Sequence, residues 1–124
     1  MTTANQSLKD IFSQLEKAGG IIRLQGKPFV TFKGLLWIAH MHGLESIETD
    51  MVYHDPKERS AVFKATVRGK RGSFSDYGDA SPDNVSGLIK KACIRMASTR
   101  AQARALRQYL GIGLCSLEEL PETV

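Results

Sequence analysis

Ile94-Arg95-Met96-Ala97-Ser98-Thr99-Arg100-Ala101-Gln102-Ala103-Arg104-Ala105-Leu106-Arg107 is the stretch that says most about how this chain folds. It is rich in Ala, Leu, Arg, Met and Gln, the strongest helix formers, and predicts a long helix. Arg100, Arg104 and Arg107 stand at i, i+4 and i+7, so at about 100° per residue they fall within a wedge of roughly 60°. We call this the arginine wedge and expect it to meet negative charge, while the other faces are buried.

The distribution of charge supports this expectation. Arginines that only solvate a helix usually alternate with acidic residues, yet no Asp or Glu occurs between Gly87 and Leu110. The net charge of +4 is also unevenly spread: residues 1–60 are neutral, residues 61–107 carry ten basic residues against three acidic, and residues 108–124 carry three acidic residues only. A basic block of this kind indicates a phosphate-backbone binder, and an acidic protein partner and an anionic membrane surface are the other ligand classes that it fits.

Length and composition predict one soluble domain over residues 1–124, with residues 116–124 as a frayed tail. No segment is apolar over about 18 residues and no signal peptide opens the chain, so we expect a cytoplasmic protein with no membrane partner. If its source is bacterial, archaeal or a phage, association with the nucleoid is expected. Cys93 and Cys115 fit a reducing compartment, and Cys93 is expected in the core.

Hydrophobic periodicity and turn residues predict an α+β fold. Its core is an antiparallel three-stranded meander with a long helix packed across it, preceded by a helix, a short hairpin and a second helix. The expected helices are 7–18, 34–42 and about 83–110, and the expected strands are 21–24, 29–32, 47–54, 60–68 and 73–77. Ser81-Pro82 is typical of a helix start and Gly111 of a helix end.

Two groups of basic residues are expected to line one groove where the long helix crosses the meander. They are Arg100, Arg104 and Arg107 on the helix, and Lys64, Arg68, Lys70 and Arg71 on the meander. Such a groove suits a single-stranded nucleic acid, because cations neutralise phosphates and guanidinium planes stack on bases.

Three aromatic residues accompany this set. Tyr77 and Tyr109 are expected in the core, with stacking on bases as the alternative. Trp37 lies between apolar neighbours and is also expected in the core, with contact to a neighbouring subunit as the alternative.

Candidate metal ligands have plainer explanations. His40 and His42 point to different sides of a helix, so they are not expected to share an ion. Asp76, Asp79 and Asp83 suit turn formation and helix capping better than a divalent cation. We therefore expect no metal, no cofactor and no enzymatic activity.

Several segments occur in a recognisable order. They are Gly34-Leu35-Leu36-Trp37-Ile38-Ala39, then Lys70-Arg71-Gly72-Ser73-Phe74 with Tyr77-Gly78-Asp79-Ala80, and last Thr99-Arg100-Ala101-Gln102-Ala103-Arg104-Ala105-Leu106-Arg107-Gln108-Tyr109-Leu110-Gly111. With them, about residues 21–115 resemble the annealing domain of Rad fifty-two-type recombination mediators and related phage single-strand annealing proteins.

The resemblance implies a β-β-β-α core, a homo-oligomer in the form of a ring, and single-stranded DNA wound along a basic groove on its outside. It assigns the family's groove arginines to Arg104 and Arg107, a hairpin lysine in a second DNA contact to Lys70, and a further basic residue to Arg23. The lysine that usually precedes the first groove arginine is Ala103 here, with Arg100 one turn earlier.

The expected function is therefore binding of single-stranded DNA and annealing of complementary strands in homologous recombination or DNA repair, without catalysis. Two alternatives use the same residues. One is a module for double-stranded or structured RNA, which is also built from a three-stranded sheet and a flanking helix. The other is an interaction module that binds an acidic protein. A small hydrolase that uses the aspartates is the last alternative.

Overall fold

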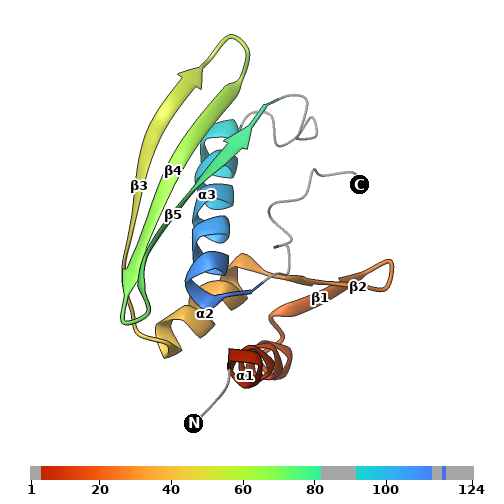
Figure 1. Ribbon diagram of the computed structural model, residues 1–124. Coiled ribbons are helices and arrows are strands. Elements are labelled where there is room, and N and C mark those ends of the chain that lie inside the picture. The colour runs from red at the N-terminus through yellow and green to blue at the C-terminus, as the bar shows by residue number, and fades with distance from the viewer. Residues whose placement is uncertain (1–3, 82–91, 113–115, 117–124) are drawn as a thin grey trace.

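The computed structural model describes residues 4–81, 92–112 and 116, and it confirms the α+β fold (Figure 1). The elements are α1 (Ala4–Lys17), β1 (Ile21–Leu24), β2 (Lys27–Val30), α2 (Phe32–Met41), β3 (Leu44–Asp55), β4 (Ser60–Gly69), β5 (Gly72–Ala80) and α3 (Cys93–Leu110). The strands form two antiparallel sheets, a hairpin of β1 and β2 and a meander in the order β3-β4-β5.

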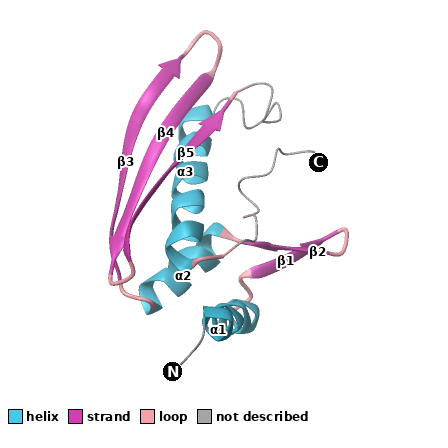
Figure 2. Ribbon diagram, in the orientation of Figure 1, coloured by secondary structure: helices cyan, strands magenta, loops and turns pink. Residues whose placement is uncertain are grey.

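The meander and α3 form the main layers of the molecule, with α3 lying along one face of the sheet (Figure 2). The alternation expected for β4 places every second side chain against α3, and these residues are buried: Ala61, Phe63, Ala65 and Val67. The partners of β4 on either side follow its register, with Ile47 opposite Val67 on β3 and Phe74 opposite Val67 on β5.

Gly78 brings the backbones of β5 and α3 into direct contact. A Cβ atom at this position would collide with the backbone nitrogen of Ala101 and the carbonyl oxygen of Ala97. Ala97 and Ala101 stand one turn apart on α3 and are fully buried. Small residues on both sides therefore let the helix approach the edge of the sheet closely.

The smaller elements lie towards the C-terminal end of α3 (Figure 1). α2 packs on α3 and α1 packs on α2, so Leu15, Ile38 and Leu106 belong to one continuous core with the sheet. Val30, at the end of β2, forms a parallel bridge with Ser116, which ties the chain beyond α3 to the hairpin.

The observed elements differ from the expected ones mainly at their ends. Phe32 was expected in a strand but begins α2, because Thr31 caps this helix by accepting a hydrogen bond from the backbone N–H of Gly34 at 3.0 Å. β3 and β5 are longer than expected, since pairing with β4 extends through polar residues that carry no apolar signal. Gly111 ends α3 in the left-handed conformation, as expected. The expected helical residues 83–91 and the tail 117–124 lie outside the described residues.

Cys93 is buried in the first turn of α3, which confirms its place in the core, whereas Cys115 lies outside the described residues. Within the described part of the chain, none of the helices is both long and apolar enough to cross a bilayer.

Candidate nucleic-acid interface

The arginine wedge of α3 runs along β5, the edge strand of the sheet. Three side chains on this side of α3 donate hydrogen bonds to backbone carbonyl oxygens of β5: Arg100 Nη1 to Asp79 at 2.8 Å, Arg104 Nη1 to Tyr77 at 2.9 Å, and Gln108 Nε2 to Ser75 at 3.3 Å. Each step of four residues along the helix is matched by a step of two residues back along the strand.

This match follows from the geometry of the two elements. Four residues of α-helix rise about 6 Å and two residues of strand about 6.6 Å. Alternate carbonyls of an edge strand point away from its neighbour, so a donor from every helical turn can meet each of them in order. Side chains of α3 therefore occupy the outward carbonyls of β5, and we call this series of three bonds the edge ladder.

Arg100 is the most buried member of the edge ladder, with only 2% of its surface exposed. The expectation that it stands open to a ligand beside Arg104 is wrong for this reason. Arg100 points in the direction about the helix axis that its spacing in the sequence predicts. The edge of β5, and not solvent, lies in that direction. Arg100 therefore stabilises the contact between β5 and α3.

Arg104 and Arg107 are the members of the arginine wedge that reach solvent. Arg104 keeps 30% of its side chain exposed, and besides its bond to Tyr77 it lies 3.6 Å from the carboxylate of Asp79. Arg107 is half-buried one turn further along the same wedge. The end of α3 that carries these two residues is the end nearest the β4–β5 turn.

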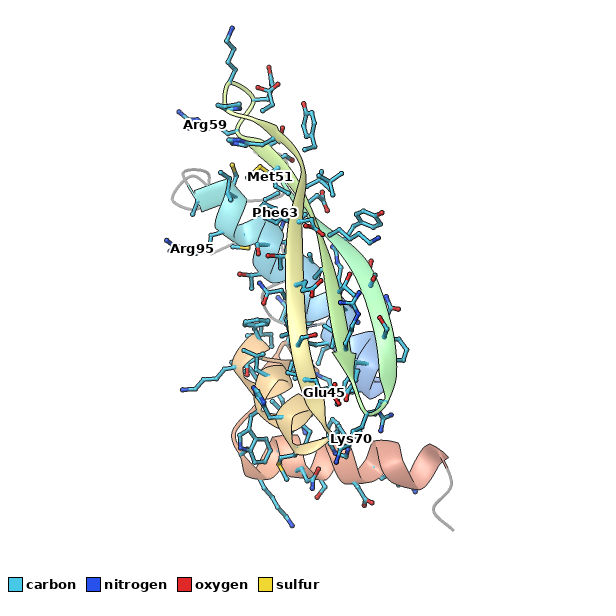
Figure 3. The ribbon with its side chains drawn as sticks, turned by 90° about the vertical axis from the view of Figure 1, so that its left-hand side faces the viewer. Glu45, Met51, Arg59, Phe63, Lys70 and Arg95 are labelled. Carbon is cyan, nitrogen blue, oxygen red and sulfur yellow. The ribbon has the colours of Figure 1, made fainter. Side chains whose placement is uncertain are left out.

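Lys70 and Arg71, both exposed, form this turn, and it is fastened to the C-terminal end of α3 (Figure 3 shows Lys70 at the lower end of the sheet, far from Arg95 at the start of α3). Arg71 Nε donates to the carbonyl oxygen of Tyr109 at 2.7 Å. Carbonyls of the last helical turn lack partners within the helix, so a cation is favourable there. The structure thus brings Lys70, Arg71 and Arg107 to one end of the molecule.

His42 and Tyr109 hold this end together from the other side. The Tyr109 hydroxyl donates to the carbonyl oxygen of His42 at 2.8 Å, and the Tyr109 ring meets Phe74 edge-to-face at 5.9 Å. Burial, and next the positive charge of Arg71, lower the pKa of the His42 imidazole below its ordinary value. Sequence reasoning missed His42 in this role, because the contact joins residues 67 positions apart.

Lys64 and Arg68 do not share a groove with the arginine wedge. Both lie on β4 at positions that alternate with the buried residues, so they project from the face of the sheet opposite α3. There Arg68 pairs with Glu48 at 3.1 Å, and Lys64 lies directly across from Asp50 in the register. The expected groove between these two residues and the helix is therefore wrong.

Arg23 lies apart from both groups. It is on β1, and its guanidinium forms an exposed ion pair with Glu16 of α1 at 2.8 Å. Of the eight expected basic residues, two lie in the β4–β5 turn, Lys70 and Arg71, and two lie in the C-terminal half of α3, Arg104 and Arg107. We call these four residues the cationic end.

Of the three aromatic residues expected in the core, the structure buries one and exposes two. Tyr109 is buried, as expected, but Tyr77 is 51% exposed on the outer face of the sheet. Trp37 was expected in the core and is 43% exposed, on the side of α2 that faces away from α3. The buried face of α2 is made by Gly34, Leu35, Ile38 and Ala39, and the apolar neighbours of Trp37 in sequence gave no sign that it lies off this face.

Candidate metal ligands do not gather in the described residues, where no group of three or more His, Cys, Asp or Glu side chains is close enough to hold an ion. Asp76 instead accepts a hydrogen bond from Gln108 at 2.6 Å, and Asp79 lies beside Arg104. Asp83 lies outside the described residues.

No protein-family model, curated protein or solved structure matches this chain.

Proposed function

We propose that this protein binds single-stranded DNA and promotes annealing of complementary strands, as its resemblance to single-strand annealing proteins implies. The observation that carries the proposal is the cationic end: Arg104 and Arg107 reach solvent on a helix without acidic residues, and the turn that carries Lys70 and Arg71 is bonded to the last turn of the same helix. Four cations from two elements, all at least partly exposed, suit a phosphate backbone that runs from the C-terminal half of α3 to the β4–β5 turn.

Annealing by such a surface requires no cofactor and no catalytic residue. Base pairing supplies the free energy, and the protein lowers the electrostatic repulsion between two strands by neutralising phosphates. Contacts of the cationic end to the backbone leave the bases along it exposed for pairing. The proposed site of action is the cytoplasm, wherever recombination or repair produces single strands.

Self-association belongs to the same proposal. The resemblance implies a homo-oligomeric ring, in which the cationic ends of successive copies would form a continuous track for one strand. Sedimentation velocity of the purified chain, with and without oligonucleotide, measures the number of subunits. A monomer under both conditions would restrict the proposal to binding by single copies.

The decisive experiment compares two double variants with equal loss of charge. Arg104→Ala/Arg107→Ala removes two cations from the cationic end, and Lys64→Ala/Arg68→Ala removes two from the opposite face of the sheet. We expect the wild type and the second variant to accelerate annealing of complementary oligonucleotides in a fluorescence-quench assay. The first variant should lose the acceleration, bind more weakly, and show a salt slope smaller by about two.

Each outcome has a defined meaning. Equal losses in both variants would show that only total charge matters, and the cationic end would lose its role. Tight binding without acceleration would leave a DNA-binding protein that does not anneal. Stronger competition by duplex RNA than by single-stranded DNA would favour the RNA alternative, and no binding of either nucleic acid at low salt would favour an acidic protein partner.

A further inference from the structure

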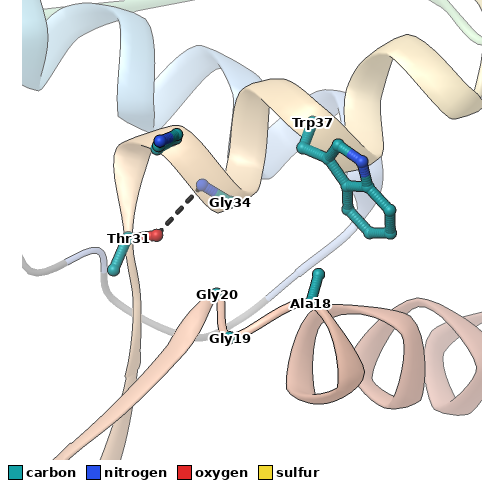
Figure 4. A pocket seen from close by; sticks show the side chains of 7 residues that line it. Ala18, Gly19, Gly20, Thr31, Gly34 and Trp37 are labelled. Atoms are coloured by element: carbon teal, nitrogen blue, oxygen red, sulfur yellow. Dashed lines mark hydrogen bonds between the residues drawn. The ribbon is translucent and has the colours of Figure 1, made fainter.

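A pocket of about 300 Å³ lies between the end of α1 and the first turns of α2, away from the cationic end (Figure 4). Its lining residues are Ala18, Gly19, Gly20, Thr31, Lys33, Gly34 and Trp37. The volume is at the lower end of the range for small-molecule sites and suits a single planar ring with a substituent.

The floor of the pocket is held rigidly by backbone contacts. Gly20 and Gly34 approach so closely that a Cβ atom on Gly34 would lie 2.9 Å from the Cα of Gly20. Backbone hydrogen bonds fix the same segment, from Thr31 N–H to the Gly20 carbonyl at 2.9 Å and from Gly20 N–H to the Leu15 carbonyl at 2.8 Å. The pocket is therefore formed before any ligand arrives, which lowers the entropic cost of binding.

Trp37 provides an aromatic wall. Its indole stands at the mouth of the pocket above Ala18, with a large part of its surface open to solvent (Figure 4). Burying a Trp side chain is among the most favourable contributions to folding, so one left exposed at a preformed cavity marks a place for an apolar or aromatic ligand. The small residues opposite it leave room for a flat ring.

The charge of the lining residues indicates which group the ligand carries besides an apolar or aromatic ring. Lys33 is the one ionisable residue among those lining the pocket in the described chain. It lies in the first turn of α2, which has no acidic residue, although the helix dipole favours anions at this end and disfavours a lysine. The pocket therefore combines two sources of positive potential, with no carboxylate in its lining to neutralise them.

Lys33 and Trp37 stand at i and i+4, so their Cβ atoms lie about 5–6 Å apart on one face of α2. A nucleotide spans such a distance between its base and its phosphate. We infer that this pocket binds one nucleotide unit of single-stranded DNA, with the base stacked on Trp37 and the phosphate beside Lys33. The inference rests on the proposed function and adds a second contact for the strand, distinct from the cationic end.

Trp37 is the only tryptophan of the chain, so its fluorescence reports directly on the pocket. Stacking of a base on the indole should quench the emission when oligothymidylate or thymidine monophosphate is added. Binding of the same oligonucleotide is followed independently by the anisotropy of a fluorescein label at its end.

Three variants separate the contributions. Trp37→Leu removes the aromatic face and should weaken binding about tenfold, whereas Trp37→Phe should remain within about threefold of the wild type. Lys33→Gln should lower the salt slope by about one. Met41→Ala is the matched control, because Met41 is exposed one turn further along α2 but does not line the pocket.

The outcomes distinguish this inference from the proposed function. Binding detected by anisotropy, with unchanged Trp37 emission and wild-type affinity in Trp37→Leu, would overturn the pocket and leave the function intact. Absence of binding by anisotropy would refute the function, and quenching by the mononucleotide alone would then decide for or against the pocket. Wild-type emission that depends on protein concentration and not on nucleotide, with this dependence lost in Met41→Ala, would mean that another copy covers this face and would overturn the inference.

Discussion

Replacing Arg100 by methionine tests whether the most buried arginine of the wedge serves the fold or the ligand. Methionine keeps much of the length and apolar volume of the side chain, so the substitution removes the charged donors with little change in packing. The lost bond joins the buried guanidinium of Arg100 to the carbonyl oxygen of Asp79 at 2.8 Å, at the part-buried edge of β5. A hydrogen bond to a charged group contributes about 1.5–3 kcal/mol, and we expect a destabilisation of that size.

The substitution also removes the desolvation cost of burying the guanidinium. This gain in stability works in the opposite direction, and we expect it to be smaller than the loss of the hydrogen bond. It would dominate only if the apolar side chain left no polar group without a partner, whereas methionine offers the Asp79 carbonyl no donor. At about 4 °C per kcal/mol for a domain of this size, the melting temperature should fall by roughly 6–12 °C.

Urea and thermal unfolding followed by circular dichroism measure this change. Arg68→Met is the control, since its ion pair with Glu48 is exposed and such pairs contribute about 0–1 kcal/mol. An Arg100→Met protein as stable as the wild type that nevertheless binds DNA more weakly would refute the structural role and return Arg100 to the ligand.

Other substitutions test the remaining contacts. Gly78→Ala places a methyl group against the backbone of α3, so it should destabilise the protein by about 3 kcal/mol or more, and near-wild-type unfolding would show that the helix can move away. Thr31→Ala removes the cap of α2 and should cost about 1 kcal/mol in chemical denaturation, whereas Thr31→Ser should restore it; equal losses in the two would exclude the hydroxyl as the cause. Because burial and Arg71 lower the folded-state pKa of His42 below 6.5, the unfolded chain binds the proton more tightly, and the free energy of unfolding should fall as the pH drops below about 6.5. His42→Gln should reduce this decline, and an unchanged pH dependence would assign it to other groups.

The fold could be predicted from local signals because they agree with one another. The alternation of β4, the glycines at the ends of α2 and α3 and the helix-forming composition around Arg104 each specify their own element. The ends of β3 and β5 could not be predicted in this way, since cross-strand pairing determines them and their polar residues give no periodic signal.

The candidate site was harder to predict than the fold. The angle of Arg100 on its helix follows from spacing, but its burial depends on where β5 lies. The sequence already implied that Lys64 and Arg68 lie apart from the arginine wedge. Alternation along the strand places them on the face opposite the side chains that pack on the helix. Only the fold, by contrast, brings the β4–β5 turn to the last turn of α3 and leaves Trp37 uncovered.

The edge ladder has a consequence for assembly. A sheet with two bare edges can recruit strands without limit, which is the route to fibrils. Here α3 occupies the outward carbonyls of β5, whereas β3, the longest strand in the described residues, has only β4 as a neighbour there. Strand addition is thus restricted to one side, and two copies joined along β3 would expose only sealed edges. By covering the edge of β5, the arginines of α3 therefore limit how many copies can join by strand addition, whether or not they also bind a ligand.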